Sequence, residues 1–148
     1  MVCASHAIAS GLASDGGLFV PKELPHLSAT EIQAMVDASY SQRAIMILKQ
    51  FLTDFSEAEL KDCVTKAYSK ESFGDEIVPL HKVKNNVDVL ELWHGPTSAF
   101  KDMALQILPQ FLTKAVAKTG EEQKLVILVA TSGDTGKAAL DGFADVDG

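Results

Sequence analysis

The strongest constraint on the fold is an uninterrupted apolar segment near the end of the chain, residues 124–130, which begins at a lysine. An extended strand with this sequence would have no polar face. Both of its faces should therefore be buried, as in a central parallel strand covered by helices. The segment leads into a glycine-rich turn at residues 131–136 and then into a helical pattern that includes Phe143. Strand, glycine-rich turn and helix form the unit of an α/β sheet that binds ligands at the carboxyl ends of its strands, so we predict an α/β fold.

The first half of the chain predicts a group of helices. Ser28 and Ser56 are each followed three residues later by a glutamate, which is the capping-box pattern that opens a helix. Another helix is predicted from about Ser41. The apolar residues at helical spacing are Ile32, Met35, Val36 and Tyr40, then Ala44, Ile45, Ile47, Leu48, Phe51 and Leu52, and then Leu60, Cys63, Val64 and Ala67. We assign these stripes, and Met46 with them, to a core, because burial explains them without a ligand.

Two further segments are marked by residues that break regular structure. The N-terminal residues predict a short helix, a tight turn at residues 14–17 and a short strand at residues 18–20, because paired glycines after an aspartate supply the positive φ that a tight turn needs. Residues 102–118 predict a long amphipathic helix, and Pro109 inside it should kink or break the helix locally.

A hairpin separates the helical part from the rest of the chain. Residues 77–83 and 87–92 predict its two strands, with a pair of asparagines at the turn, and Pro79 favours an edge position. We therefore predict a mainly helical N-terminal part over residues 1–75 and the start of an α/β domain over residues 76–148.

Composition excludes several function classes. The chain has 148 residues with 13 basic and 20 acidic side chains, a net charge of −7, and an acidic surface argues against nucleic acid and anionic membrane as partners. The N-terminus lacks the basic and apolar regions of a secretory signal. Cys3 and Cys63 have neither metal-ligand nor CxxC spacing, so no metal site is predicted. We interpret both as reduced thiols of a cytoplasmic protein.

Lys101 is the first candidate for chemistry. It follows a His-Gly-Pro-Thr sequence and opens the predicted helix at residues 102–118. A helix N-terminus repels cations, and this repulsion, with partial burial beside Phe100, would favour the neutral amine that a Schiff-base lysine requires. The alternative is a solvated surface lysine with Asp102 as a helix-start residue, and spacing alone favours that alternative.

The glycine-rich turn at residues 131–136 is the second candidate. Its hydroxyl groups and backbone N–H groups stand at a predicted helix start, where an anion such as a carboxylate or phosphate can bind. It is not a Walker A motif, because Ala138 stands where Ser or Thr would hold magnesium. A purely structural turn is the alternative. A lysine at one helix start and an anion cradle at another would together suit covalent carbonyl chemistry on an anionic substrate.

At these residues the chain resembles the threonine synthases, a family of pyridoxal-phosphate enzymes of fold type II. The resemblance rests on residues 94–102 (His-Gly-Pro-Thr-Ser-Ala-Phe-Lys-Asp), residues 130–136 (Ala-Thr-Ser-Gly-Asp-Thr-Gly) and residues 11–21, which occur in the family's order. The lysine motif is quite specific, whereas the glycine-rich loop is shared more loosely among fold type II enzymes. The resemblance implies conversion of O-phospho-L-homoserine and water to L-threonine and phosphate.

The resemblance also implies roles for individual residues. Lys101 would carry pyridoxal 5'-phosphate in Schiff-base linkage and, once freed, would move protons at the α and β carbons of the substrate. Phe100 would pack against the cofactor ring, and Asp134 would contact either the cofactor hydroxyl or the substrate. The residues that would bind the substrate carboxylate are Thr131, Ser132, Gly133 and Thr135. For His94, a pocket role and a structural hydrogen bond to the adjacent turn both stay open, and hydroxyl contacts from Thr97 and Ser98 are further candidates.

The chain also departs from the family pattern. It lacks the short Ser-Thr-Arg segment with which the family usually begins, and the family is much longer at its C-terminal end. The loop that would hold the cofactor phosphate belongs to that further part. Because residues 145–148 resemble a loop before another strand, we expect an N-terminal portion of a longer enzyme, with an incomplete α/β domain that is inactive alone.

Two other functions stay open at this stage. One is a related fold type II enzyme, a dehydratase or phospho-lyase without the water-addition step. The other is a folded fragment without catalytic activity. Monomer and homodimer are equally open.

Overall fold

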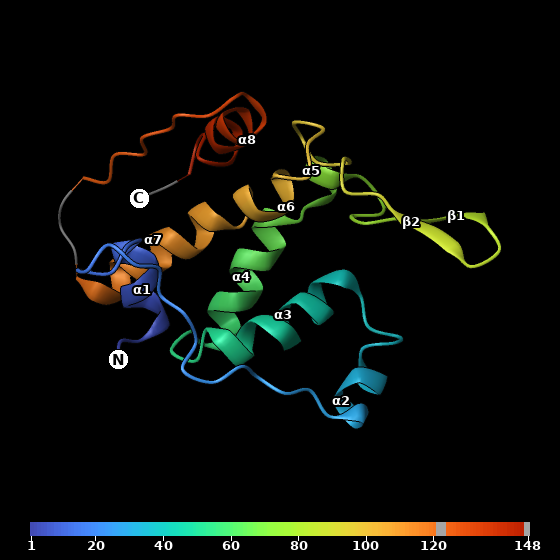
Figure 1. Ribbon diagram of the computed structural model, residues 1–148, viewed down its shortest axis with the longest axis horizontal. Helices are drawn as coiled ribbons and strands as arrows, with labels where there is room; N and C mark the ends of the chain where they lie inside the picture. Colours follow the sequence, from blue (N-terminus) through green and yellow to red (C-terminus); the bar gives the residue numbers. More distant parts are fainter. Residues whose placement is uncertain (121–123, 147–148) are drawn as a thin grey trace. The chain divides into compact units, whose positions relative to one another are not determined.

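The computed structural model describes residues 1–120 and 124–146, and Figure 1 shows its helices and strands coloured along the sequence. The chain divides into two compact units. The first is formed by Met1–Thr65 and Phe111–Gln123, and the second by Lys66–Gln110 and Lys124–Gly148. The division predicted at residue 75, between a mainly helical part and the start of an α/β domain, stays a prediction.

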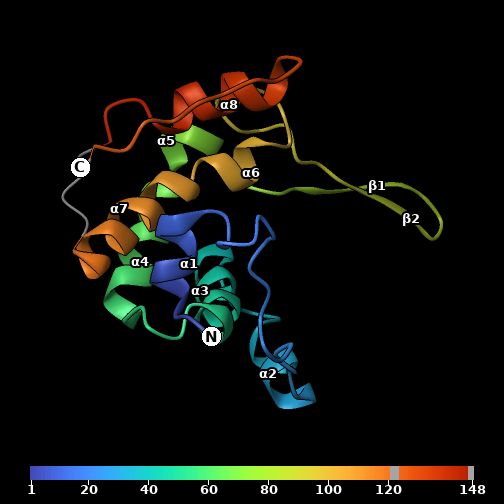
Figure 2. The ribbon, with the colours of Figure 1, turned by 60° about the vertical axis from the view of Figure 1, so that its left-hand side comes forward.

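The regular structure of the first unit is helical, as Figure 2 shows. Its helices are α1 (Ala4–Ser10), α2 (Ala29–Ala34), α3 (Tyr40–Phe51), most of α4 (Glu57–Ala67) and most of α7 (Leu108–Thr119). Both predicted capping boxes are confirmed. The N–H of Ser28 donates to Glu31 Oε2 at 2.8 Å, and the N–H of Glu31 donates to Ser28 Oγ at 3.2 Å. Ser56 and Glu59 make the same exchange at 2.7 and 3.3 Å, which satisfies N–H groups that a helix start leaves without partners.

The boundary between α2 and α3 differs from the prediction. Tyr40 is the first residue of α3, although the sequence pattern assigned it to the preceding helix. Ser39 opens α3 with a capping box of its own, in which its N–H donates to Gln42 Oε1 at 2.8 Å. The Arg43 side chain donates to the carbonyl oxygens of residues 35 and 36, at 2.7 and 2.9 Å. These contacts end α2 early, because they satisfy the carbonyl groups that a longer helix would have used.

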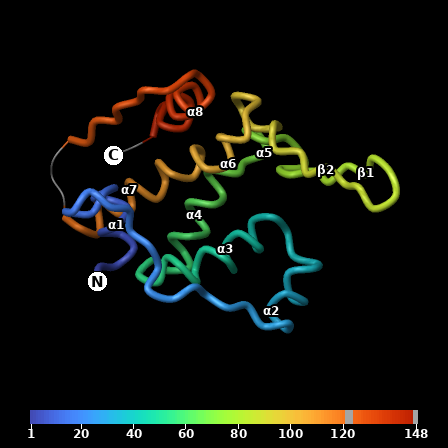
Figure 3. The backbone as a smooth tube through the Cα atoms, in the orientation of Figure 1, coloured from blue at the N-terminus to red at the C-terminus, as the bar shows by residue number. Residues whose placement is uncertain are grey.

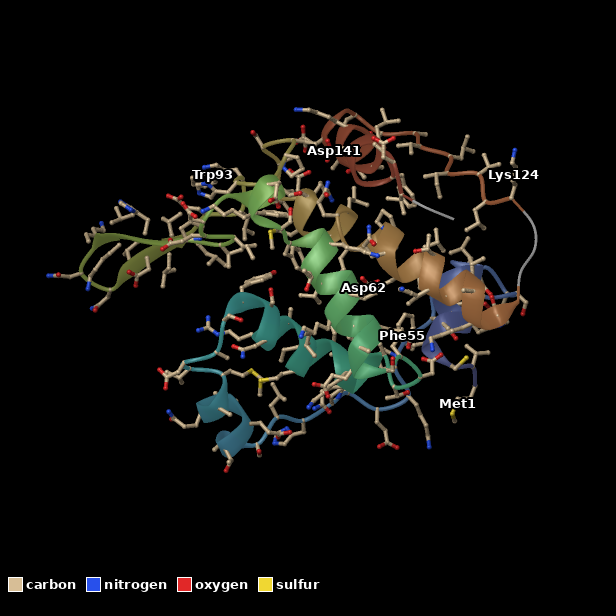
Figure 4. All side chains as sticks on the ribbon, turned by 180° about the vertical axis from the view of Figure 1, so that it is seen from behind. Met1, Phe55, Asp62, Trp93, Lys124 and Asp141 are labelled. Atoms are coloured by element: carbon tan, nitrogen blue, oxygen red, sulfur yellow. The ribbon has the colours of Figure 1, made fainter. Side chains whose placement is uncertain are left out.

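Apolar packing between α4 and α7 forms the core of the first unit. The Phe55 and Phe111 rings meet edge to face with centroids 5.9 Å apart, a favoured geometry for aromatic pairs (Figure 4 labels Phe55). The buried apolar residues here include Phe55, Leu60, Cys63, Val64, Phe111 and Ala115. Ile32, Val36 and Phe51, which were predicted on apolar faces, are 55%, 57% and 43% exposed, so their assignment to a core is wrong.

Ion pairs flank this core. Lys114 Nζ lies 2.9 Å from Asp62 Oδ2, and Lys118 Nζ lies 2.9 Å from Glu59 Oε1. The backbone N–H of Ser56 and the Lys118 ammonium hold the pKa of the Glu59 carboxyl below its ordinary value. These pairs bind one edge of α4 to α7.

The second unit contains α5 (Lys70–Phe73), the hairpin strands β1 (Leu80–Lys84) and β2 (Val87–Leu90), α6 (Asp102–Leu105) and α8 (Asp134–Gly142). The predicted hairpin is confirmed: the strands are antiparallel, Leu80 faces Leu90 and Lys82 faces Asp88. Asn86 has φ of 62° in the turn, a conformation that Asn tolerates better than most residues. Pro79 lies just before β1, and its carbonyl accepts from the Glu91 N–H at 2.9 Å.

The predicted break at Pro109 is confirmed. The helical segment stops at Leu105 and resumes at Leu108, so α6 and α7 are separate helices. Proline has no N–H to donate, and its ring would clash with the carbonyl of Leu105, four residues earlier. Pro109 therefore lies in the first turn of α7, where a proline is tolerated.

Two predicted strands do not form. Residues 124–130 run extended toward α8 without pairing, as the tube in Figure 3 shows, and their apolar side chains are exposed, Val126 by 83% and Leu128 by 93%. Residues 18–20 are also unpaired, although the tight turn before them forms, with Gly16 at φ of 83°. A strand requires a neighbouring strand, and the β1–β2 hairpin is the only sheet in residues 1–120 and 124–146.

The helices of the described ranges are too short or too polar to cross a membrane.

Candidate functional site

Lys101 precedes the first residue of α6 as its N-cap, with φ of −60° and ψ of −26°. The side chain is half-buried, and its ammonium lies 4.7 Å from the centre of the Phe100 ring, which is itself 58% exposed. Within the described part of the chain, Lys101 Nζ has no carboxylate or carbonyl partner. The amine is thus held beside an aromatic ring and is free of hydrogen bonds that would compete for it.

The helix that Lys101 opens is shorter than predicted. A neutral amine was predicted from a long helix over residues 102–118, but α6 has 4 residues and is separated from α7 by the break before Pro109. A helix dipole grows from the alignment of many peptide units, so α6 contributes much less repulsion than an unbroken helix would.

The turn before Lys101 is closed by a buried carboxylate. Asp102 is 0% exposed, and it accepts from the backbone N–H of Thr97 at 2.8 Å and from the Thr97 hydroxyl at 2.6 Å. Burial of a carboxylate is costly unless hydrogen-bond donors replace water, and Thr97 supplies two of them. The Thr97 hydroxyl is therefore committed to the turn, whereas Ser98 is exposed and has φ of 58°.

Gly95 is required by this closed turn. A Cβ atom at this position would lie 2.5 Å from the Asp102 side chain, closer than real atoms approach. Any larger residue would push Asp102 away from Thr97 and displace the backbone next to Lys101.

His94 contacts the residues just before the turn. Its Nε2 lies 2.6 Å from Glu91 Oε2, and its ring stacks on Trp93 with centroids 5.7 Å apart. This bond to Glu91 is not the predicted bond to the turn, so both predicted roles of His94 stay predictions.

Some backbone N–H groups of the glycine-rich loop are hydrogen-bonded within the loop itself. Thr131 Oγ1 accepts from the N–H of Gly133 at 3.3 Å and from the N–H of Gly136 at 2.9 Å. These two amides are thus engaged inside the loop, although a cradle for an anion was predicted from them. Asp134 and Thr135 are the first residues of α8, and such N–H groups have no acceptor inside the helix. The Thr131 hydroxyl still has its own proton to donate, and Ser132 and Asp134 are exposed.

Packing of α8 against α6 brings the two loops to the same side of the second unit. Gln106 Nε2 donates to Asp141 Oδ2 at 2.7 Å, and Gly142 lies against the backbone carbonyl of Leu105, so the C-terminal ends of the two helices meet (Figure 4 labels Asp141). Near their N-terminal ends, Lys137 Nζ donates to the carbonyl of Thr97 at 3.0 Å. The helices therefore run in roughly the same direction, with Lys101 and the glycine-rich loop both at their starts.

Three residues of this arrangement were missed from the sequence. Asp102 and Lys137 had no site role in the prediction, and Thr97 was expected only as a hydroxyl donor. Gly95 could have indicated the role of Asp102, because a glycine can mark a place where another side chain packs closely against the backbone. Nothing in the sequence spacing indicates that Lys137 reaches Thr97, which lies 40 residues earlier.

Comparisons with known proteins agree on one family. Residues 1–68 match the family profile described as threonine synthase N terminus. Threonine synthase of Pseudomonas aeruginosa is 43% identical over 139 residues, which cover 93% of this chain and 29% of that protein. Human threonine synthase-like 1 is 42% identical over 143 residues, which cover 95% of this chain and 19% of that protein.

A solved structure extends the agreement to the backbone. The crystal structure of a PLP-bound threonine synthase from Brucella melitensis superposes with a TM-score of 0.90 and 39% identity, over 99% of this chain and 31% of that one. The match confirms the predicted fold class: a helical N-terminal part with a hairpin, followed by the first part of a fold type II α/β domain. The chain spans less than a third of the length of these relatives. In sequence and in backbone the chain is similar to threonine synthases, and residues 1–68 match the N-terminal profile of that family.

Proposed function

We propose that this chain supplies the reactive lysine and the substrate-carboxylate loop of a threonine synthase, which converts O-phospho-L-homoserine and water to L-threonine and phosphate. One observation carries the proposal: Lys101, whose amine has no polar partner in the described ranges, lies on the same side of the second unit as the exposed loop at residues 131–136. Activity would also need residues beyond this chain, because it spans 29% of the Pseudomonas relative.

The residues around Lys101 fit pyridoxal phosphate. The cofactor, when bound, supplies an electron sink for the carbon atoms next to the substrate amine. Lys101 Nζ is half-buried and free to hold it, and the exposed Phe100 ring offers a flat surface beside that amine. Lys101 Nζ would also be the base and acid that moves protons at the α and β carbons of the substrate.

The loop at residues 131–136 would hold the substrate carboxylate. Its donors are the hydroxyl groups of Thr131, Ser132 and Thr135 together with the N–H groups that open α8. Gly133 is the N-cap of α8 with φ of 148°, a conformation that only glycine adopts readily, and it leaves the approach to those N–H groups open. Asp134 is exposed at the same point, where it would contact either the cofactor hydroxyl or the substrate.

The proposal extends to organisation and location. Residues 1–75 would form the helical part, and residues 76–148 would begin the cofactor-binding domain. A cytoplasmic location would agree with the interpretation of Cys3 and Cys63 as reduced thiols. The partner would be the small-molecule substrate.

Substitution of Lys101 tests the assignment. Lys101→Ala should abolish the pyridoxal phosphate that borohydride fixes to the protein, because no other amine would occupy the same position. Lys82→Ala, on the exposed strand β1, is the matched control and should leave the fixed amount unchanged. The measurement is absorbance of the reduced cofactor on the purified protein. If Lys101→Ala retains the label while folded, the assignment is wrong.

A further inference from the structure

Thr97 touches both halves of the candidate site. Its N–H and its hydroxyl donate to Asp102, the residue next to Lys101, at 2.8 and 2.6 Å. Its carbonyl accepts from Lys137 of α8 at 3.0 Å. Thr97 is 6% exposed, so water does not readily replace these partners.

The contacts of Thr97 with Asp102 and with Lys137 differ in kind, and together they hold the two loops in one relative position. The contact with Asp102 is buried and doubly hydrogen-bonded, so it sets the backbone that leads into Lys101. The contact with Lys137 joins that backbone to the first turn of α8, which begins directly after the loop at residues 131–133. A shift of either loop must therefore strain or break a bond to Thr97.

We propose that Thr97 is a positioning residue that couples the two loops, with Asp102 and Lys137 as its partners, so that Lys101 keeps its place relative to residues 131–136. The effect of this coupling on catalysis rests on the proposed function, in which Lys101 is the reactive amine and residues 131–136 bind the substrate carboxylate. The bonds themselves are independent of any ligand.

One substitution weakens the link to Asp102 and another removes the link to Lys137, each with little change in volume. Thr97→Val removes the hydroxyl bond to Asp102, and Lys137→Met removes the ammonium but keeps a long apolar stem. Thr97→Ser and Lys137→Arg restore a donor and should rescue. Thr119→Val is the matched control, because the Thr119 hydroxyl bonds to the Ala115 carbonyl at 3.1 Å in the first unit.

Two readouts report on the two loops. Hydrogen exchange of the Gly136 amide, which is bonded to Thr131, follows the glycine-rich loop. The rate at which borohydride fixes pyridoxal phosphate to Lys101, located by peptide mapping, follows the lysine. We expect Thr97→Val to speed Gly136 exchange about fivefold and Lys137→Met to slow Lys101 labelling about fivefold, since a single hydrogen bond of this kind contributes about that factor.

The outcomes separate the inference from the proposed function. If Lys101 is labelled selectively but neither substitution changes either readout, the coupling is overturned and the proposed function stands. If Thr97→Val speeds Gly136 exchange but Lys101 is not labelled selectively in the unsubstituted chain, the coupling stands and the proposed function fails. Should Thr97→Val not fold, Lys137→Met decides alone, because its side chain is exposed.

Discussion

The first and second units are stabilised in different ways. In the first, α4 and α7 pack through fully buried apolar side chains such as Leu60 and Val64, both 0% exposed. In the second, α6 and α8 meet through a glycine and through hydrogen bonds, and the buried apolar side chains of α8 are the small ones of Ala138 and Ala139, whereas the apolar residues 125–129 stay exposed. Apolar burial provides most folding free energy, whereas directional hydrogen bonds determine position more than stability. The largest losses of stability are therefore expected from substitutions in the first unit. Substitutions in the second unit should cost less stability and should also change the geometry around Lys101.

The largest expected effect tests the apolar core. Leu60→Ala should lower the free energy of unfolding by about 2–5 kcal/mol, because it removes buried methyl groups and leaves a cavity. Urea denaturation measures this change. Ile32→Ala, at a position that is 55% exposed, is the control and should change it by less than about 0.5 kcal/mol. Equal effects at the two positions would contradict an apolar core centred on α4.

A smaller effect is expected where α6 meets α8. Gly142→Ala should destabilise the protein by about 1–3 kcal/mol, because the added methyl group would overlap the Leu105 carbonyl and force the backbone to shift. Alanine has the higher helix propensity, so an isolated helix would predict the opposite sign. Thermal unfolding gives the sign. Leu140 lies on the same helix and is 75% exposed, so Leu140→Ala should change the melting temperature little.

The smallest expected effect depends on pH. The folded-state pKa of Glu59 is lowered from 4.5 by the Ser56 N–H and the Lys118 ammonium. Its contribution to stability is therefore present above pH 4.5 and is lost as the pH falls through the lower folded-state pKa. Glu59→Gln should remove that part of the pH dependence, an effect below about 1 kcal/mol for such an ion pair. The measurement is a series of unfolding curves between neutral and acidic pH, with the exposed Asp37→Asn as the control. If the pair contributed nothing, the curves of Glu59→Gln and of the parent would be superimposable.

Local signals predicted the local structure well. The capping boxes at Ser28 and Ser56 and the break before Pro109 depend on residues within one helical turn, so the sequence contains all that they need. The end of α2 was misplaced because the Ser39 capping box was overlooked. Residues 124–130 were predicted as a buried strand from their composition, but strand formation depends on a neighbouring strand, which composition cannot indicate.

The candidate site was predictable in part. Lys101 and the loop at residues 131–136 were recognisable from their motifs. The hydrogen bonds that connect them were not, because they depend on how α8 packs on α6. In particular, the Thr97–Lys137 contact exists only after that packing has formed. The hydrogen bonds from the Gly133 and Gly136 amides to Thr131 could not be predicted either, because a sequence pattern shows which donors are present but not which acceptors they meet in the fold.

The most direct test of the account is the identity of the lysine that reacts. The unsubstituted protein is incubated with limiting pyridoxal phosphate, reduced with borohydride, digested and mapped by mass spectrometry. The account predicts that the label is concentrated on Lys101, ahead of exposed lysines such as Lys82 and Lys84. Labelling spread over the exposed lysines, or concentrated on Lys137, would contradict the claim that Lys101 is the amine that this fold prepares for reaction.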